Sequence, residues 1–232
     1  MKQLVIVFVC MFSLMAFAQT KQTRTIGDFS GISSASGIAV EITQGTENSI
    51  IVSASKDEFI DKMITEVDKN GVLKIYMEYK KGMGWNNKYN VKLYAYVSYK
   101  SINKLMASSG SSLETKNTLK TDALSIDVSS GASMDADIQT TDCDVTMSSG
   151  SNTSVKGMAT NIKMDASSGS IFKGADLSTE NCRASVSSGA NIKIGVSKKL
   201  SASASSGGSI KYKGDPEVEK KSESSGGSIR KM

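Results

Sequence analysis

The sequence predicts an all-β fold, a single-stranded β-solenoid similar to a parallel β-helix, with rungs of about 20 residues. Two observations lead to this prediction. The first is the phrase Ser-Ser-Gly, which occurs seven times in the second half of the chain at intervals of 21, 19, 19, 20, 18 and 19 residues. Its glycines are Gly110, Gly131, Gly150, Gly169, Gly189, Gly207 and Gly226.

The second observation is an alternation of apolar and polar residues before each Ser-Ser-Gly, which is typical of a strand with one buried face. The residues one, three and five positions before the first serine are apolar, as in Leu124, Ile126 and Val128. The residues between them are polar, as in Ser125 and Asp127. Three positions after each glycine, six of the seven residues are apolar, so a second inward-facing strand begins there.

Ser-Ser-Gly and the small residue after it therefore form a tight corner between the two strands of one rung. Glycine supplies a backbone with positive φ or a bulge, and small neighbours let successive corners stack closely. A nucleophilic role for the serines is not favoured, because the chain contains no histidine to serve as their base.

Residues 24–105 lack this period and are expected to form an irregular, β-rich N-terminal part, while residues 106–232 form the regular rungs. Apolar residues at helical spacing between Asp57 and Val67 predict a short helix. The dipeptide Asn70-Gly71 predicts a hairpin turn after it.

The first residues have the features of an export signal. A basic start and an apolar run end at the small residues Ala16 and Ala18, which suit signal peptidase. We therefore expect a signal peptide over 1–18 and a single domain over 19–232 without a membrane span, located in the periplasm, at the cell surface or outside the cell. A lipoprotein site at Cys10 is the alternative, but the residues before Cys10 are bulky.

Composition excludes several function classes. The formal net charge is +5, with 28 basic and 23 acidic residues interspersed, which is not the pattern of a nucleic-acid-binding protein. The absence of histidine removes the commonest zinc ligand and the usual catalytic base. The Gly-Gly-x-Gly-x-Asp turn of calcium-binding β-rolls does not occur. We expect no cofactor, no metal site and no catalytic residue.

Two cysteines remain after cleavage, Cys143 and Cys182. An even number of cysteines in an exported protein points to a disulfide, but the alignment places both in one inward column, two rungs apart. Rungs stack at about 4.8 Å, so the two Cα atoms lie roughly 9–10 Å apart, beyond the limit of about 7 Å for a disulfide. The spacing predicts two buried free thiols.

One outward column contains the main candidate binding residues. Four positions after each glycine the chain has Glu114, Asp135 and Ser154, followed by four consecutive cations. We call these cations the basic stripe: Lys173, Lys193, Lys211 and Arg230. A row of like charges is a candidate site for acidic glycans or phosphate-bearing polymers. The alternative is a solvated edge whose lysines splay apart.

Aromatic residues form a second candidate surface. Six of the seven tyrosines and the only tryptophan lie between residues 76 and 99. If the apolar residues of these strands face inward, Tyr76, Tyr94 and Tyr96 face outward beside a loop that contains Trp85. Such aromatics suit sugar stacking or a protein interface, although tyrosine is also simply favourable in strands.

Several motifs in order resemble a known family. These are Phe29-Ser30-Gly31-Ile32, the segment from Gly37 to Gly45, the segment from Asn70 to Ile75, and the segment from Val91 to Val97 that leads to Ser108-Ser109-Gly110. Together with the Ser-Ser-Gly period they resemble the exported bacterial "putative auto-transporter adhesin head GIN domain" family, over residues 28–230. Where this family often has a proline after the second strand, the chain has Tyr99. The resemblance implies a β-helical envelope or secreted protein without a known reaction or catalytic residues.

We therefore expect a non-enzymatic exported protein with a binding surface for an acidic glycan or an envelope protein. A carbohydrate-active enzyme on the same scaffold is the first alternative, and a structural or self-associating envelope component is the second. Charged residues in the inward columns of the last unit, Glu219, Lys221 and Glu223, indicate a capped end rather than open stacking.

Overall fold

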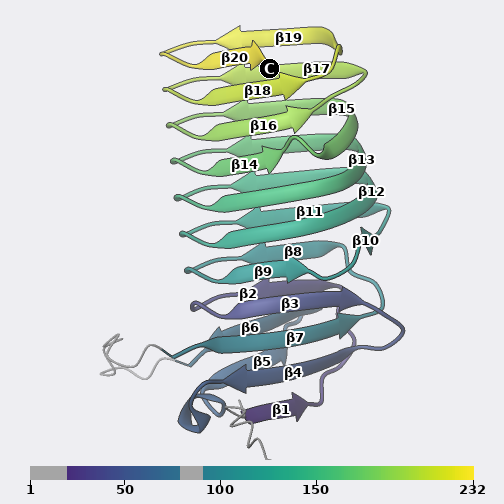
Figure 1. The fold of residues 1–232 in the computed structure, drawn as a ribbon, viewed down its shortest axis with the longest axis vertical. Coiled ribbons are helices and arrows are strands. Elements are labelled where there is room, and N and C mark those ends of the chain that lie inside the picture. Colours follow the sequence, from purple (N-terminus) through teal and green to yellow (C-terminus); the bar gives the residue numbers. More distant parts are fainter. Residues whose placement is uncertain (1–19, 79–90) are drawn as a thin grey trace, which may run out of the picture.

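The computed structural model describes residues 20–78 and 91–232, and the proposed signal peptide and Trp85 lie outside these ranges. These described residues form twenty strands and one short 3-10 helix, Asp57–Phe59 (Figure 1). The strands are β1 (Thr20–Arg24), β2 (Gly31–Ser34), β3 (Ala39–Gln44), β4 (Ser49–Ala54), β5 (Met63–Val67), β6 (Val72–Met77), β7 (Leu93–Tyr99), β8 (Lys104–Ala107), β9 (Ser112–Thr115), β10 (Leu119–Lys120), β11 (Ala123–Val128), β12 (Ser133–Met147), β13 (Asn152–Ala166), β14 (Ile171–Gly174), β15 (Leu177–Val186), β16 (Asn191–Gly195), β17 (Lys199–Ala204), β18 (Ser209–Lys213), β19 (Glu217–Glu223) and β20 (Ser228–Lys231).

The fold is a flattened β-solenoid of about seven turns with rungs of about 19 residues, which confirms the predicted fold class. Each rung contributes one strand to each of two faces. Face A, toward the viewer in Figure 1, stacks β1, β4, β7, β3, β9, the first halves of β12 and β13, β14, β16, β18 and β20. Face B stacks β5, β6, β2, β8, β11, the second halves of β12 and β13, β15, β17 and β19.

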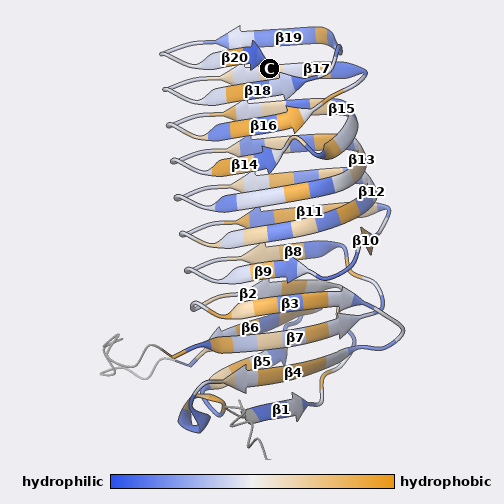
Figure 2. Ribbon diagram, in the orientation of Figure 1, coloured by the Kyte–Doolittle hydropathy of each residue, from blue (hydrophilic) through white to orange (hydrophobic). Residues whose placement is uncertain are grey.

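The core lies between the two faces, and the predicted inward columns are buried. On face B the column Ile126, Val145, Met164, Ala184 and Ala202 is at most 3% exposed, and its members are Cα partners in successive rungs. Polar and apolar residues alternate along the strands (Figure 2), so each strand has one face in the core and one in solvent. The alternation of apolar and polar residues in the sequence thus predicts which side chains point into the core and which point into solvent.

The corners have the geometry that the small residues permit. In every Ser-Ser-Gly both the second serine and the glycine have positive φ, as in Ser168 at 51° and Gly169 at 71°. The N–H of the residue after the glycine donates to the carbonyl of the first serine, as from Ser170 to Ser167 at 3.1 Å, which is the pattern of a type I′ turn. In six of the seven corners the glycine N–H also donates to a serine carbonyl of the next rung, as from Gly169 to Ser188 at 3.0 Å.

An eighth corner lies in the part that the sequence indicated as irregular. Ser36 and Gly37 have φ values of 62° and 70°, and the Gly37 N–H donates to the Ser109 carbonyl at 3.0 Å. The rung formed by β2 and β3 lies between the rung of β6 and β7 and the rung of β8 and β9. After β3 the chain therefore forms β4 to β7 at the base of the stack. It then returns to form the rung of β8 and β9 on the opposite side of the rung of β2 and β3.

The predicted helix between Asp57 and Val67 is wrong. Only Asp57–Phe59 is helical, as a 3-10 turn, and Met63–Val67 is strand β5. This strand pairs antiparallel with β6 across the turn at Asn70-Gly71. The pairing gives hydrogen-bond partners to backbone N–H and C=O groups that would have none at the ends of a short helix. Arg24 of β1 closes the base by donating to the carbonyls of Ile60, at 2.6 Å, and Met63.

The last rung ends the stack with inward charges, but with one change from the predicted columns. A register shift after Leu200 makes Val218 its partner and Lys220 the partner of Ser201. Glu219 is therefore not in an inward column, and it pairs instead with Lys199 at 2.7 Å. Lys221 and Glu223 do stand in the inward columns and form an ion pair at 3.5 Å.

Candidate functional site

A single outward column of face A holds most of its charged residues, and we call it the charge column. It runs across eight strands, from β3 to β20, and its members are Cα partners in successive rungs. In order they are Glu41, Glu114, Asp135, Ser154, Lys173, Lys193, Lys211 and Arg230. The structure thus brings the four cations of the basic stripe side by side, at a rung spacing of about 4.8 Å.

The two halves of the charge column differ in electrostatic compensation. Lys116 Nζ lies 3.0 Å from Glu114 Oε1 and 3.5 Å from Glu41 Oε1, and these carboxylates raise the pKa of Lys116. Within residues 20–78 and 91–232, by contrast, no carboxylate lies within 4.0 Å of a cation of the basic stripe. All four cations are exposed. The stripe therefore presents positive charge that no ion pair within the described residues neutralises, although Arg230 is near enough to Glu223 to help lower the pKa of that carboxyl.

The predicted aromatic residues do not form one cluster. Tyr94 and Tyr96 lie outward on face A, with ring centroids 6.5 Å apart and ring planes at 12°, and Lys21 Nζ lies 5.4 Å from the Tyr96 centroid. Tyr76 lies on β6 of face B and donates to Glu66 Oε1 at 3.0 Å, a hydrogen bond that raises the pKa of Tyr76. Tyr96 is the Cα partner of Glu41, so it continues the charge column toward the base.

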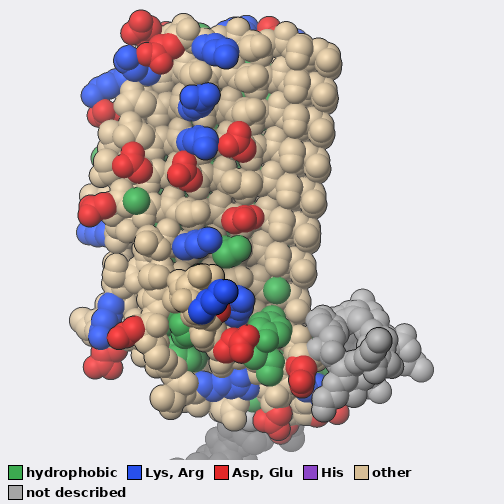
Figure 3. All heavy atoms as spheres, turned by 180° about the vertical axis from the view of Figure 1, so that it is seen from behind, with side chains coloured by type: hydrophobic (Ala, Val, Ile, Leu, Met, Phe, Trp, Pro, Cys, Tyr) green, Lys and Arg blue, Asp and Glu red, His purple; other side chains and the backbone are tan. Residues whose placement is uncertain are grey.

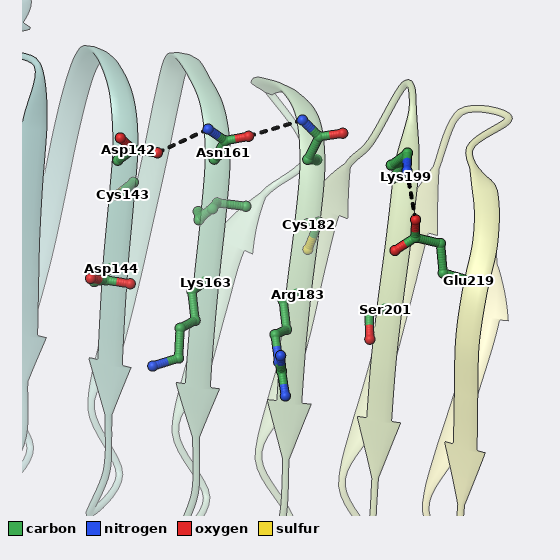
Figure 4. Close-up of a pocket in the computed structure, with 12 residues that line it drawn as sticks. Asp142, Cys143, Asp144, Asn161, Lys163, Cys182, Arg183, Lys199, Ser201 and Glu219 are labelled. Atoms are coloured by element: carbon green, nitrogen blue, oxygen red, sulfur yellow. Dashed lines mark hydrogen bonds and ion pairs between the residues drawn. The ribbon is translucent and has the colours of Figure 1, made fainter.

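Face B contains a groove that sequence analysis did not single out (Figure 4). Its volume is about 480 Å³, and one wall is a row of side chains linked by hydrogen bonds. Asn161 Nδ2 donates to Asp142 Oδ1 at 2.9 Å, and Asn181 Nδ2 donates to Asn161 Oδ1 at 2.9 Å. Lys163 and Arg183 line the groove as Cα partners from the next outward column.

The groove could have been found from the same alignment that predicted the rungs. Asp142, Asn161 and Asn181 each stand eight positions before a corner glycine, so their side chains recur in one outward column. On face B the charged side chains form columns beside the uncharged edge of the corners (Figure 3). Amides, hydroxyls and mixed charges in an open groove suit a hydroxyl-rich chain, but the groove lacks an aromatic wall on which a sugar ring could stack.

Cys143 and Cys182 contribute to the floor of this groove from the inward side. Both are buried and free, and each is a Cα partner of Ile162 between them. Burial raises the pKa of each thiol to about 12, so neither is a thiolate at neutral pH. Within the described residues no group of three or more Cys, Asp or Glu side chains is arranged to hold a metal ion.

Comparisons with known proteins agree with the fold. The family model described as "Putative auto-transporter adhesin, head GIN domain" matches residues 28–216. A putative adhesin from Bacteroides fragilis has a similar structure, with a TM-score of 0.82 and 17% sequence identity over 93% of this chain and 97% of that one. A putative adhesin from Parabacteroides distasonis gives a TM-score of 0.72 at 16% identity, over 93% and 97% of the two chains.

A third solved structure, a "putative lipid binding protein" also from Parabacteroides distasonis, gives a TM-score of 0.64 at 19% identity over 92% and 96% of the chains. No curated protein matches the chain. In the part of the chain that the structure describes, no helix has the length and apolar character needed to cross a membrane. At these identities the solved structures show the fold alone.

Proposed function

Since this chain belongs to the family described as "putative auto-transporter adhesin, head GIN domain", we propose that it is an exported, non-enzymatic, adhesin-like protein of the cell envelope. Its signal sequence over 1–18 directs export. Its binding surface is face A, and the basic stripe is the part of that face that contacts a partner. The partner carries negative charge, as an acidic glycan or as an acidic surface of an envelope protein.

One observation supports this proposal most strongly. Lys173, Lys193, Lys211 and Arg230 are adjacent, exposed and without a carboxylate within 4.0 Å in the described residues. Adjacent like charges repel one another, so the unbound stripe carries an electrostatic cost that a polyanionic partner removes. The stripe also lies on regular strands, which hold the charges at fixed spacing.

The test is binding of the purified protein to immobilised polygalacturonate and to whole cells at low ionic strength. The stripe variant carries Lys173→Glu, Lys193→Glu and Lys211→Glu. The control variant carries the same number of reversals at exposed lysines outside the stripe: Lys69→Glu, Lys100→Glu and Lys120→Glu. We expect at least a tenfold loss of binding for the stripe variant alone. Equal binding by the two variants would contradict the proposed role of the stripe.

A further inference from the structure

The charge column reverses sign about its centre. Ser154 stands in the middle, with three acidic residues on one side and four basic residues on the other. Counting rungs outward from Ser154, Asp135 matches Lys173, Glu114 matches Lys193, and Glu41 matches Lys211. One rung further, Tyr96 matches Arg230. The column is thus its own electrostatic complement when it is read in the opposite direction.

From this pattern we infer that the partner of face A is a second copy of this chain, bound face to face in antiparallel orientation. This inference rests on the proposed use of face A as the binding surface and names its partner. The two-fold axis runs parallel to the strands at the level of Ser154. Such an axis reverses the stacking direction but keeps each position along the strands, so every outward column faces itself. The interface is isologous, and each charge pair occurs twice.

The neighbouring columns of face A are compatible with this arrangement. The column two residues closer to the corners consists mainly of small or uncharged side chains, which allow close approach. Its members above β7 are Ala39, Ser112, Ser133, Asn152, Ile171, Asn191, Ser209 and Ser228.

The column on the other side of the charge column contains the remaining charges near the axis. Lys116, beside the acidic half, lies 3.0 Å from Glu114 and 3.5 Å from Glu41 of its own chain. Lys156 lies on the axis, where it faces the same lysine of the other copy, and its charge is offset by Asp137 of its own chain at 3.8 Å. Lys116 therefore weakens the attraction at Glu114 and Glu41, whereas Asp135, which has no ion pair within the described residues, keeps its full attraction to Lys173 of the other copy.

Most other arrangements of the same faces reduce the complementarity. A parallel pair, with both copies stacked in one direction, places the two basic stripes opposite each other. Moving the axis by one rung brings Asp135 or Lys173 opposite its own copy, and a half-rung shift toward Asp135 leaves Asp135 opposite Ser154. A half-rung shift toward Lys173 still pairs the three acidic residues with cations, but it leaves Lys173 opposite Ser154 near the axis, whereas the proposed axis leaves only the terminal Arg230 without a carboxylate. Face B lacks this symmetry, because an axis at Lys163 brings Lys104 opposite Lys220.

The size of the surface sets the strength of the contact. The nine strands from β7 to β20 span roughly 40 Å at 4.8 Å per rung, and the exposed width is about 15 Å. Each copy therefore contributes about 600 Å², which is at the small end of specific interfaces. Because charges rather than apolar side chains dominate, the dimer is a weak one that forms at low ionic strength. Antiparallel pairing of this kind would let one adhesin-like molecule bind another.

The test uses charge reversal in both halves of the column, with sedimentation velocity as the measurement. The acid-reversed variant carries Glu41→Lys, Glu114→Lys and Asp135→Lys, and the base-reversed variant is the stripe variant above. We expect wild type to dimerise at about 0.01 M ionic strength and to dissociate near 1 M, where the screening length falls from about 30 Å to about 3 Å. Each variant alone should associate at least tenfold more weakly.

Two further samples distinguish pairing of specific residues along the charge column from a general effect of net charge. An equimolar mixture of the two variants is expected to form a heterodimer, and a variant with all six reversals is expected to regain the homodimer, because its column is again complementary to itself. The lysine control variant should dimerise like wild type. If wild type is monomeric at low salt, or if the six-fold variant is not restored, the inference is wrong. Should polygalacturonate binding still depend on the stripe in that case, the proposed function stands and an acidic glycan is the partner.

Discussion

The corner geometry predicts that one substitution, glycine to alanine, has very different costs at two positions with positive φ. At Gly169, in a Ser-Ser-Gly corner, φ is +71° and a Cβ atom would meet no atom within 4 Å. The cost is therefore conformational only, about 1–2 kcal/mol for an L-residue in the left-handed region. A less flexible unfolded chain offsets about 0.4–1 kcal/mol of this. We expect Gly169→Ala to lower the free energy of unfolding by about 1 kcal/mol.

At Gly157, inside β13, φ is +102° and a Cβ atom would lie 2.1 Å from the Ile138 carbonyl oxygen. Since that oxygen belongs to the backbone of the preceding rung, the two rungs must separate locally. We expect Gly157→Ala to cost more than about 4 kcal/mol, which is a large part of the stability of an ordinary domain. Urea unfolding followed by circular dichroism measures both values. Equal costs at the two glycines would refute the account of the corners.

Three further predictions concern the thiols, the base and the end of the stack. Without reductant, Cys143 and Cys182 should resist alkylation in the folded protein and both react after denaturation, whereas a protected pair in the denatured protein would indicate a disulfide. The N–H groups of Val72 and Asn70, together with Lys74, lower the pKa of Asp68, so this carboxylate stabilises the fold above the pKa of the unfolded chain, near 3.9, and loses that contribution as pH falls through its lower folded pKa. Asp68→Asn should thus lower the melting temperature at pH 7, and its difference from wild type should shrink as the pH falls below about 3.9; a difference that stays constant down to low pH would contradict this. Replacing Lys221 and Glu223 by valine removes the inward charges of the last rung and should produce concentration-dependent association in light scattering, while a monomeric variant would show that the charges are not needed as a cap.

The regular rungs could be predicted because their information is local. A strand, a corner and a second strand follow one another within about 20 residues. In each strand the alternation of apolar and polar residues shows which side chains face the core and which face solvent. The same alignment also placed the basic stripe in one outward column and predicted that the two cysteines are too far apart to form a disulfide. The neighbours of these residues in space are the residues one repeat away in the sequence. The repeat spacing is therefore sufficient to predict which side chains lie side by side.

The remaining features depend on contacts that the period does not describe. Glu41 belongs to the charge column only because the rung of β2 and β3 is inserted above β7, and no local signal marks that insertion. The segment around Met63 has spacing that fits a helix as well as a strand, and pairing with β6 decides between them. Glu219 leaves its expected column because of one bulge. Long-range pairing, rather than residue preference, sets all three outcomes.

The antiparallel self-complementarity of the charge column is tested most directly by distances between spin labels in the dimer at low salt. Labels at corner positions, introduced by Ala35→Cys, Ser205→Cys and Ser224→Cys, lie at the edge of the interface, and the buried native thiols do not react. Positions 35 and 205 are both three rungs from the proposed axis, so each should give a distance between copies of roughly 30 Å, and position 224, four rungs away, roughly 40 Å. The same distance at all three positions would mean a parallel dimer, and the absence of any dipolar coupling would mean no dimer; either result would contradict the account.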